Sequence, residues 1–208
     1  SETKYNVIDL FAGCGGFSQG FLAAGFDIVA ANEFWKPAIE TYKYNHVTTQ
    51  LIEGDITLPE IKQELYDRVK NKKIHVIIGG PPCQAYSISG NRNPDDPRGR
   101  LYVDFLDIVA HLQPDFFVME NVKGLLHMKH VDPKLSRPKL QQFKIHCQQL
   151  QRFKDLKRYR AQRRLDPAEE QEYFSLRKQV KELKQEIDKR LMPLLNIILS
   201  KIKEIKYK

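Results

Sequence analysis

The sequence lacks any apolar run of the roughly 18 residues that a membrane span needs, and no stretch has the pattern of a secretory signal. We therefore expect neither a membrane span nor export. Cysteine is scarce as well. Cys14, Cys83 and Cys147 are odd in number, far apart and without the spacing of metal ligands. This pattern predicts free thiols in a reducing cytoplasm and no metal site.

Residues 1–150 lack an excess of either charge, with 17 lysines and arginines against 17 aspartates and glutamates. Residues 151–208 hold 17 against 9, so the net charge of +8 comes from the last third of the chain. A basic tail can contact nucleic-acid phosphates, but lysine-rich helices are also common solvated faces. Both interpretations stay open at this point.

Strand and helix signals alternate up to about residue 120. Apolar runs predict strands at 5–12, 26–31, near 53–55, at 74–78 and at 115–120, with helices at 17–24, 37–45, 59–69 and 101–111. Such alternation is typical of a parallel sheet covered by helices on both faces. We therefore expect an α/β fold with a doubly wound, mostly parallel sheet over residues 1–137.

Strand signals largely disappear beyond about residue 138, where apolar residues recur at helical spacing. The two stripes are Leu176, Val180, Leu183 and Ile187, then Leu195, Ile198, Ile202 and Ile205. Asp166 before Pro167 predicts a helix start with an aspartate cap, and Pro193 is expected to bend or break the helical pattern around it. Residues 138–208 thus predict a basic helical extension whose stripes pack together or on another chain.

A glycine loop, Phe11-Ala12-Gly13-Cys14-Gly15-Gly16, comes after the first predicted strand. It permits a tight turn and close approach of a ligand, but it is neither the GxGxxG fingerprint nor a P-loop. Glu33 ends the second strand, where a carboxylate can accept hydrogen bonds from both ribose hydroxyls.

Two further features complete this predicted pocket. Phe34 or Trp35 can cover an adenine face, and Asp55 can accept a hydrogen bond from an adenine amino group. Each residue alone is more simply a helix-start carboxylate or a core aromatic. Together they predict an adenosine pocket without a phosphate clamp, which fits S-adenosylmethionine better than NAD or ATP.

The turn Pro81-Pro82-Cys83-Gln84 comes directly after the fourth predicted strand. Because a strand cannot continue through two prolines, Cys83 is presented at the carboxyl edge of the sheet, where open α/β sheets bind ligands. The fifth strand delivers Glu120 and Asn121 to the same edge. A thiol nucleophile and a proton donor are therefore expected to face one site.

These segments resemble, in order and spacing, motifs I to VI of the DNA (cytosine-5)-methyltransferase family over about residues 5–126. The matching stretches are Phe-Ala-Gly-Cys-Gly-Gly at 11–16, Asn-Glu at 32–33, Gly-Asp-Ile at 54–56, Pro-Pro-Cys-Gln at 81–84, Arg-Gly-Arg-Leu at 98–101 and Glu-Asn-Val at 120–122. The resemblance implies the S-adenosylmethionine-dependent methyltransferase fold and a site of three parts. The catalytic part is Cys83, Glu120 and Asn121. The cofactor-binding part is Phe11, Ala12, Gly13, Cys14, Gly15, Gly16, Glu33, Phe34, Trp35, Asp55, Ile56, Pro81 and Leu101. The DNA-contacting part is Pro82, Gln84, Ser87, Arg92 and Arg98.

The resemblance also implies a reaction, in which the Cys83 thiolate adds to C6 of a cytosine while Glu120 donates a proton to N3. C5 then accepts the methyl group of S-adenosylmethionine, and loss of the C5 proton expels Cys83. Asn121 is expected to position Glu120, and the base must leave the duplex to reach the pocket.

Motif VIII, the target-recognition region and motifs IX and X of the family are not found in this sequence. We expect a split enzyme of a bacterial restriction-modification system, acting in the cytoplasm with a second polypeptide that carries these parts. A truncated chain is the other explanation. Two alternative functions remain, a tRNA cytosine-5 methyltransferase and a binding or regulatory subunit without turnover.

Overall fold

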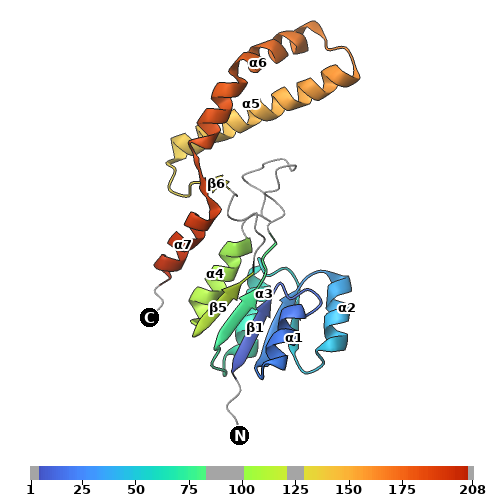
Figure 1. Ribbon diagram of the computed structural model, residues 1–208, viewed down its shortest axis with the longest axis vertical. Helices are drawn as coiled ribbons and strands as arrows, with labels where there is room; N and C mark the ends of the chain where they lie inside the picture. The colour runs from blue at the N-terminus through green and yellow to red at the C-terminus, as the bar shows by residue number, and fades with distance from the viewer. Residues whose placement is uncertain (1–4, 83–100, 121–128, 206–208) are drawn as a thin grey trace. The chain divides into compact units, whose positions relative to one another are not determined.

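The computed structural model describes residues 5–82, 101–120 and 129–205 (Figure 1). Its contacts divide the chain into two compact units, which we call the sheet unit (Ser1–Leu125 with Ile198–Lys208) and the helical unit (Leu126–Ile197). This division differs from the boundary predicted after residue 137, because residues 126–137 go with the helices and 198–208 with the sheet. Within the described ranges, no helix is both long and apolar enough to cross a membrane.

The sheet unit contains a five-stranded parallel sheet in the order β3-β2-β1-β4-β5. The strands are β1 (Asn6–Leu10), β2 (Asp27–Glu33), β3 (Gln50–Glu53), β4 (Val76–Gly79) and β5 (Phe116–Met119). Strand order reverses between β1 and β4, as it does in a doubly wound fold. The fold class predicted from the sequence is confirmed.

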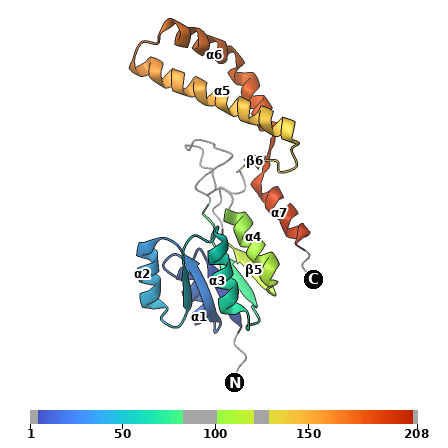
Figure 2. The ribbon, with the colours of Figure 1, turned by 180° about the vertical axis from the view of Figure 1, so that it is seen from behind.

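Helices cover both faces of this sheet. They are α1 (Gly16–Ala23), α2 (Lys36–Asn45), α3 (Pro59–Val69) and α4 (Leu101–Leu112). Figures 1 and 2 show α1 on one face and α3 and α4 on the other. All carboxyl ends of the parallel strands therefore meet at one edge, where the loops after them converge.

The core of the sheet unit results from the alternation of side chains along buried strands. Val7 and Ile78 pack with Phe17 and Phe21 of α1. Gly25, with φ 89°, ends α1 in the left-handed conformation that glycine adopts without strain. These local signals explain why the predicted elements and the observed ones agree to within a few residues.

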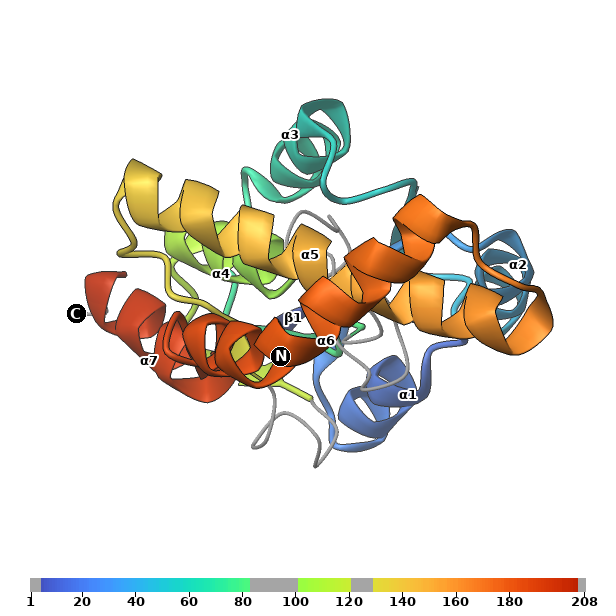
Figure 3. The same ribbon diagram turned by 90° about the horizontal axis from the view of Figure 1, so that it is seen from above.

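The helical unit is an antiparallel pair, α5 (Arg137–Gln162) and α6 (Pro167–Asp188), seen from above in Figure 3. Leu156 of α5 packs with Tyr173 and Leu176 of α6, and the Phe153 and Tyr173 rings stack with centroids 5.4 Å apart. The predicted stripe is confirmed in part, since Leu176, Leu183 and Ile187 are buried and Val180 is half-buried.

The helical unit also contains a short antiparallel ribbon, in which β6 (Lys129–Val131) pairs with β7 (Leu191–Pro193). The region beyond residue 138, predicted as a helical extension, thus also contains the strand β7, whose three residues are too few to give a strand pattern. α7 (Leu194–Glu204) begins directly after Pro193, as a proline break predicts. It buries Leu194, Ile197 and Ile198, whereas of the predicted second stripe only Ile198 is buried.

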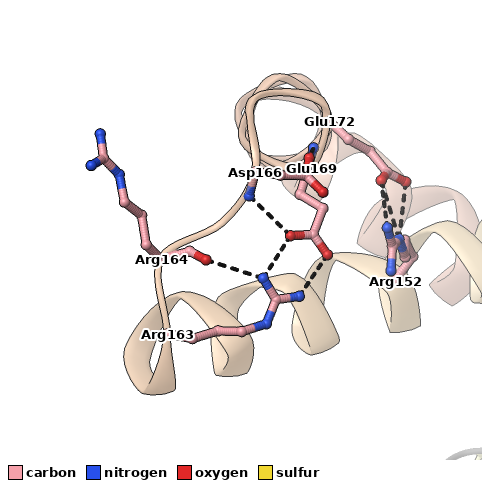
Figure 4. A network of polar contacts seen from close by, with 6 residues as sticks. All are labelled: Arg152, Arg163, Arg164, Asp166, Glu169 and Glu172. Carbon is pink, nitrogen blue, oxygen red and sulfur yellow. Dashed lines mark hydrogen bonds and ion pairs between the residues drawn. The ribbon is translucent and has the colours of Figure 1, made fainter.

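Asp166 caps α6 as the sequence predicts. Its carboxylate accepts the Glu169 N–H at 2.8 Å, and the Glu169 side chain accepts the Asp166 N–H at 3.2 Å, which completes a capping box (Figure 4). Arg163 donates two hydrogen bonds to the Glu169 carboxylate. The hydrogen bonds from Arg163 and from the Asp166 N–H lower the pKa of Glu169 to about 2.

Candidate cofactor and catalytic site

The glycine loop joins β1 to α1 through left-handed backbone, which glycine adopts without strain but residues with a Cβ rarely adopt. Phe11, Gly13 and Gly15 have φ of 56°, 56° and 92°. A Cβ on Gly15 would lie 2.1 Å from His46 Nε2, which donates a hydrogen bond to the Gly15 carbonyl oxygen at 3.1 Å. The loop therefore needs glycine at position 15 both for its φ and for the space that His46 occupies.

Glu33 fastens the end of β2 to this loop. Its Oε2 accepts the Gly13 N–H at 2.8 Å, and its Oε1 accepts the N–H groups of Phe34 and Trp35 at 2.9 and 2.8 Å. The side chain is buried, and a carboxylate offers about four lone-pair positions, so three backbone donors leave one acceptor position, on Oε2. The structure thus adds a positioning role that the sequence did not suggest.

Asn32 holds the end of β3 beside Glu33. Its Nδ2 donates to the carbonyl oxygens of Ile52 and Gly54, both at 3.0 Å. Asp55 comes directly after Gly54 and is exposed, with its Oδ1 accepting the Thr57 N–H at 2.9 Å. The three strand ends that the sequence assigned to one pocket therefore lie at one edge, connected by hydrogen bonds.

The remaining predicted cofactor residues lie at this edge with different exposures. Phe34 and Trp35 are exposed by 63% and 60%, so two large aromatic faces are available next to Glu33. Ala12, Ile56 and Pro81 are buried, Leu101 begins α4 and is half-buried, and Cys14 is an exposed free thiol. Gly16 is exposed at the start of α1.

A buried polar network beneath the loop was not found from the sequence. Asp9 of β1 accepts the Ser18 N–H at 3.1 Å and the Ser18 hydroxyl at 2.7 Å, and the Ser18 hydroxyl lies 2.7 Å from the Tyr42 hydroxyl. Burial raises the pKa of Asp9 to about 6, against the opposing effect of the Ser18 hydrogen bonds. The signal that could have revealed it is the acid itself, placed inside an otherwise apolar strand.

Glu120 lies one residue past β5, where its N–H donates to the Gly79 carbonyl oxygen at 2.9 Å and extends the pairing with β4. Its carboxylate lies beside Gly80, the residue that follows β4, because a Cβ on Gly80 would lie 2.8 Å from Glu120 Oε2. Gly80 thus makes room for the carboxylate. The side chain is exposed.

Six predicted residues fall outside the described ranges, namely Cys83, Gln84, Ser87, Arg92, Arg98 and Asn121. Of the predicted DNA contacts only Pro82 is described, and it is exposed. The described residues therefore assemble the cofactor side of the predicted site together with Glu120.

Comparison with known proteins agrees with this arrangement. Residues 5–154 match the family model for C-5 cytosine-specific DNA methylases. Over 134 residues the chain is 48% identical to the type II methyltransferase M.NgoPII of Neisseria gonorrhoeae, covering 62% of this chain and 38% of the relative. It is also 48% identical to M.DdeI of Desulfomicrobium norvegicum over 127 residues, covering 60% of this chain and 29% of the relative.

A solved DNA modification methyltransferase encoded within an E. coli prophage aligns with a TM-score of 0.47 at 35% identity. That alignment covers 65% of this chain and 34% of the solved one. The chain thus spans about a third of the length of the relatives named here. Because the family model matches well over half of its residues, the chain belongs to the C-5 cytosine-specific DNA methylase family.

Proposed function

We propose that this chain is the cofactor-binding and catalytic part of an enzyme that methylates C5 of a cytosine in duplex DNA. The observation that carries the proposal is the position of Glu120, whose carboxylate lies beside Gly80, three residues before Cys83. The glycine loop and Glu33 lie at the same sheet edge. A proton donor, a nucleophile and a nucleoside pocket then converge.

Chemically, cytosine needs both residues. C5 is a poor nucleophile within the aromatic ring, so we assign Cys83 to add through its thiolate to C6 while Glu120 transfers a proton to N3. The C5=C4 enamine so formed would accept the methyl group that bound S-adenosylmethionine would supply, with the sulfonium leaving as the neutral thioether. A base then removes the C5 proton, the C6–S bond breaks, and the N3 proton returns to Glu120. Asn121 is assigned to hold Glu120 in position.

The described pocket fits the adenosine part of that methyl donor. Oε2 of Glu33 keeps one acceptor position for a ribose hydroxyl, while Asp55 is exposed and able to accept a hydrogen bond from an adenine amino group. Phe34 and Trp35 offer aromatic faces for the base. The glycine loop carries no lysine and no phosphate clamp, which suits a ligand without phosphates.

DNA is the substrate that the description of the matching family favours. The type II names of the relatives lead us to place the reaction in a bacterial restriction-modification system. The target base would leave the duplex to reach Cys83. We assign the residues around it to DNA contact, namely Pro82, Gln84, Ser87, Arg92 and Arg98.

We further propose that a second polypeptide completes the enzyme along β5. Among the described strands β5 pairs only with β4, which leaves its other edge open. Phe116 and Val118 of β5 are exposed by 71% and 44%, an unusual state for apolar side chains of a parallel sheet. Copurification with a polypeptide that reduces the exposure of Phe116 to chemical labelling tests this proposal.

The activity is tested by incubating the chain and any copurifying polypeptide with tritiated S-adenosylmethionine and either duplex DNA or tRNA. We expect label in DNA, recovered as 5-methylcytosine after nuclease digestion, and none with Cys83→Ala. Label that survives Cys83→Ala would contradict the mechanism. Transfer to tRNA instead would support the RNA enzyme, and absence of S-adenosylmethionine binding would support a subunit without turnover.

A further inference from the structure

The net positive charge of this protein comes entirely from the helical unit. Its described residues, 129–197, hold 18 lysines and arginines against 9 aspartates and glutamates, whereas the rest of the chain holds 16 against 17. The excess is uneven within the unit. α5 has eight cations against the single acid Asp155, while α6 has four cations against six acids.

Ion pairs neutralise most acids of the helical unit rather than most of its cations. The pairs are Asp155 with Arg158, Glu169 with Arg163, Glu172 with Arg152, Glu186 with Lys189 and Arg190, and Asp188 with Lys129. These contacts lie within the unit and leave other cations exposed. The net positive charge of α5 is therefore carried by cations that are exposed to solvent.

Lys154 and Lys157 of α5, together with Arg164 in the connection that follows α5, form what we call the α5 cationic face. All three are exposed, and within the described part of the chain none of their side chains forms an ion pair. Lys154 points away from the buried Leu156, because two residues along a helix rotate by about 200°. Figure 4 shows the Arg164 guanidinium turned away from the carboxylates around it.

Along the sequence, the helical unit is inserted between the two segments of the sheet unit. The chain leaves β5 at Glu120 and enters the helical unit at Leu126, and the β6–β7 ribbon brings its ends together, with Lys129 opposite Pro193. Ile198 then returns to the sheet unit. A strongly basic module is thus tethered a few residues from the proposed proton donor.

We propose that the α5 cationic face binds the backbone phosphates of duplex DNA flanking the target base. The inference rests on the proposed function, which supplies the DNA. Exposed lysines and arginines without acidic partners are the groups that neutralise phosphates and release counterions. A contact of this kind adds affinity without reading sequence.

The test measures binding of the full chain, carrying Cys83→Ala, to a fluorescent duplex between about 0.05 and 0.3 M KCl. The test variant combines Lys154→Gln, Lys157→Gln and Arg164→Gln. The matched control combines Lys178→Gln, Lys181→Gln and Lys184→Gln, which removes the same charge from exposed positions of α6. Three lost phosphate contacts should reduce the slope of log K against log[salt] by about 2 to 3 and weaken binding at least about tenfold. The control should change the slope by less than about 1.

If both variants weaken DNA binding equally, the proposal would be contradicted, because any cations of the helical unit would then contribute equally to DNA binding. Unchanged DNA binding by the test variant would also contradict the proposal. If the test variant binds DNA normally but loses a copurifying polypeptide, the α5 cationic face would be assigned to protein binding instead. If the three substitutions weaken binding to tRNA more than binding to duplex DNA, the choice of DNA as the ligand would be overturned. Because Cys83→Ala blocks transfer, these outcomes are independent of catalysis. A failed label transfer by the unmutated chain would instead count against the proposed function.

Discussion

The Glu33 carboxylate accepts the Gly13 N–H at 2.8 Å, so the end of β2 and the loop after β1 are joined by a charge-assisted hydrogen bond. The same carboxylate caps the N–H groups of Phe34 and Trp35. One side chain therefore fixes the backbone on two sides of the proposed adenosine pocket. It still keeps an acceptor position for the ligand.

Glu33→Gln should weaken S-adenosylmethionine binding at least about tenfold, because the amide replaces one acceptor oxygen with a donor that meets a backbone N–H. Isothermal calorimetry measures this directly. The matched control is Glu53→Gln, at the paired position of β3, where an exposed carboxylate forms an ion pair with Lys43. An equal loss in both variants would show that Glu33 has no special role.

Asp9 should make folding stability depend on pH. Its pKa is raised from 3.8 to about 6, so the folded protein holds this proton more tightly than the unfolded chain does. The stabilisation is complete below about pH 4 and is lost as the pH rises through about 6, with a total of about 3 kcal/mol. Asp9→Asn should remove this dependence.

Urea unfolding of the unmutated chain and of Asp9→Asn between about pH 4 and pH 7 measures the difference. Ser18→Ala should shift the window to higher pH, since the Ser18 hydrogen bonds lower the pKa of Asp9. A difference that stays constant over this range would contradict the role given to Asp9.

Gly15→Ala should lower the free energy of unfolding by about 2 to 4 kcal/mol, because the new Cβ meets the His46 ring at a φ of 92°. Gly13→Ala, with φ 56° but nothing within 4 Å, should cost about 1 kcal/mol. Gly16→Ala has neither problem and should be close to neutral. Thermal unfolding of the three variants ranks them, and the reverse order would refute the account of the loop.

Asp166→Ala should destabilise the helical unit by about 1 kcal/mol, because the capping box loses the carboxylate that accepts the Glu169 N–H. Glu170→Ala, an exposed acid in the same turn, is the control. Loss of helical circular dichroism signal with urea reports the change. A larger effect from the control than from Asp166→Ala would assign the stability of this turn to helix-dipole charge instead of the cap.

The order of strands and helices in the sheet unit could be predicted because its signals are local. Buried strands are continuous apolar runs, Gly25 ends α1, and prolines at 37 and 59 lie in the first turns of α2 and α3. The capping box at Asp166 was predictable for the same reason. Only four consecutive residue types are needed to recognise it.

Tertiary contacts explain what the sequence did not predict. Asp9 and Tyr42 are far apart along the chain, and only the packing of α1 and α2 brings them together through Ser18. The return of residue 198 to the sheet unit depends likewise on the pairing of β6 with β7, since three-residue strands carry no periodicity. The position of Glu33 was predicted correctly, but its bond to Gly13 was not, because loop backbone conformation decides which N–H it meets.

Covalent trapping tests the central claim most directly. A duplex with 5-fluorocytosine at the target position should stop the reaction after methyl transfer, because fluorine cannot leave C5 as the proton does, and Cys83 then stays bonded to C6. Purified with any polypeptide that copurifies with it and given S-adenosylmethionine, the chain should form a denaturant-resistant complex with this DNA, linked through the peptide that contains Cys83. Cys83→Ala should form none. A covalent complex linked through another residue, or methyl transfer to the unmodified duplex without any trapped complex on the fluorinated one, would contradict the account.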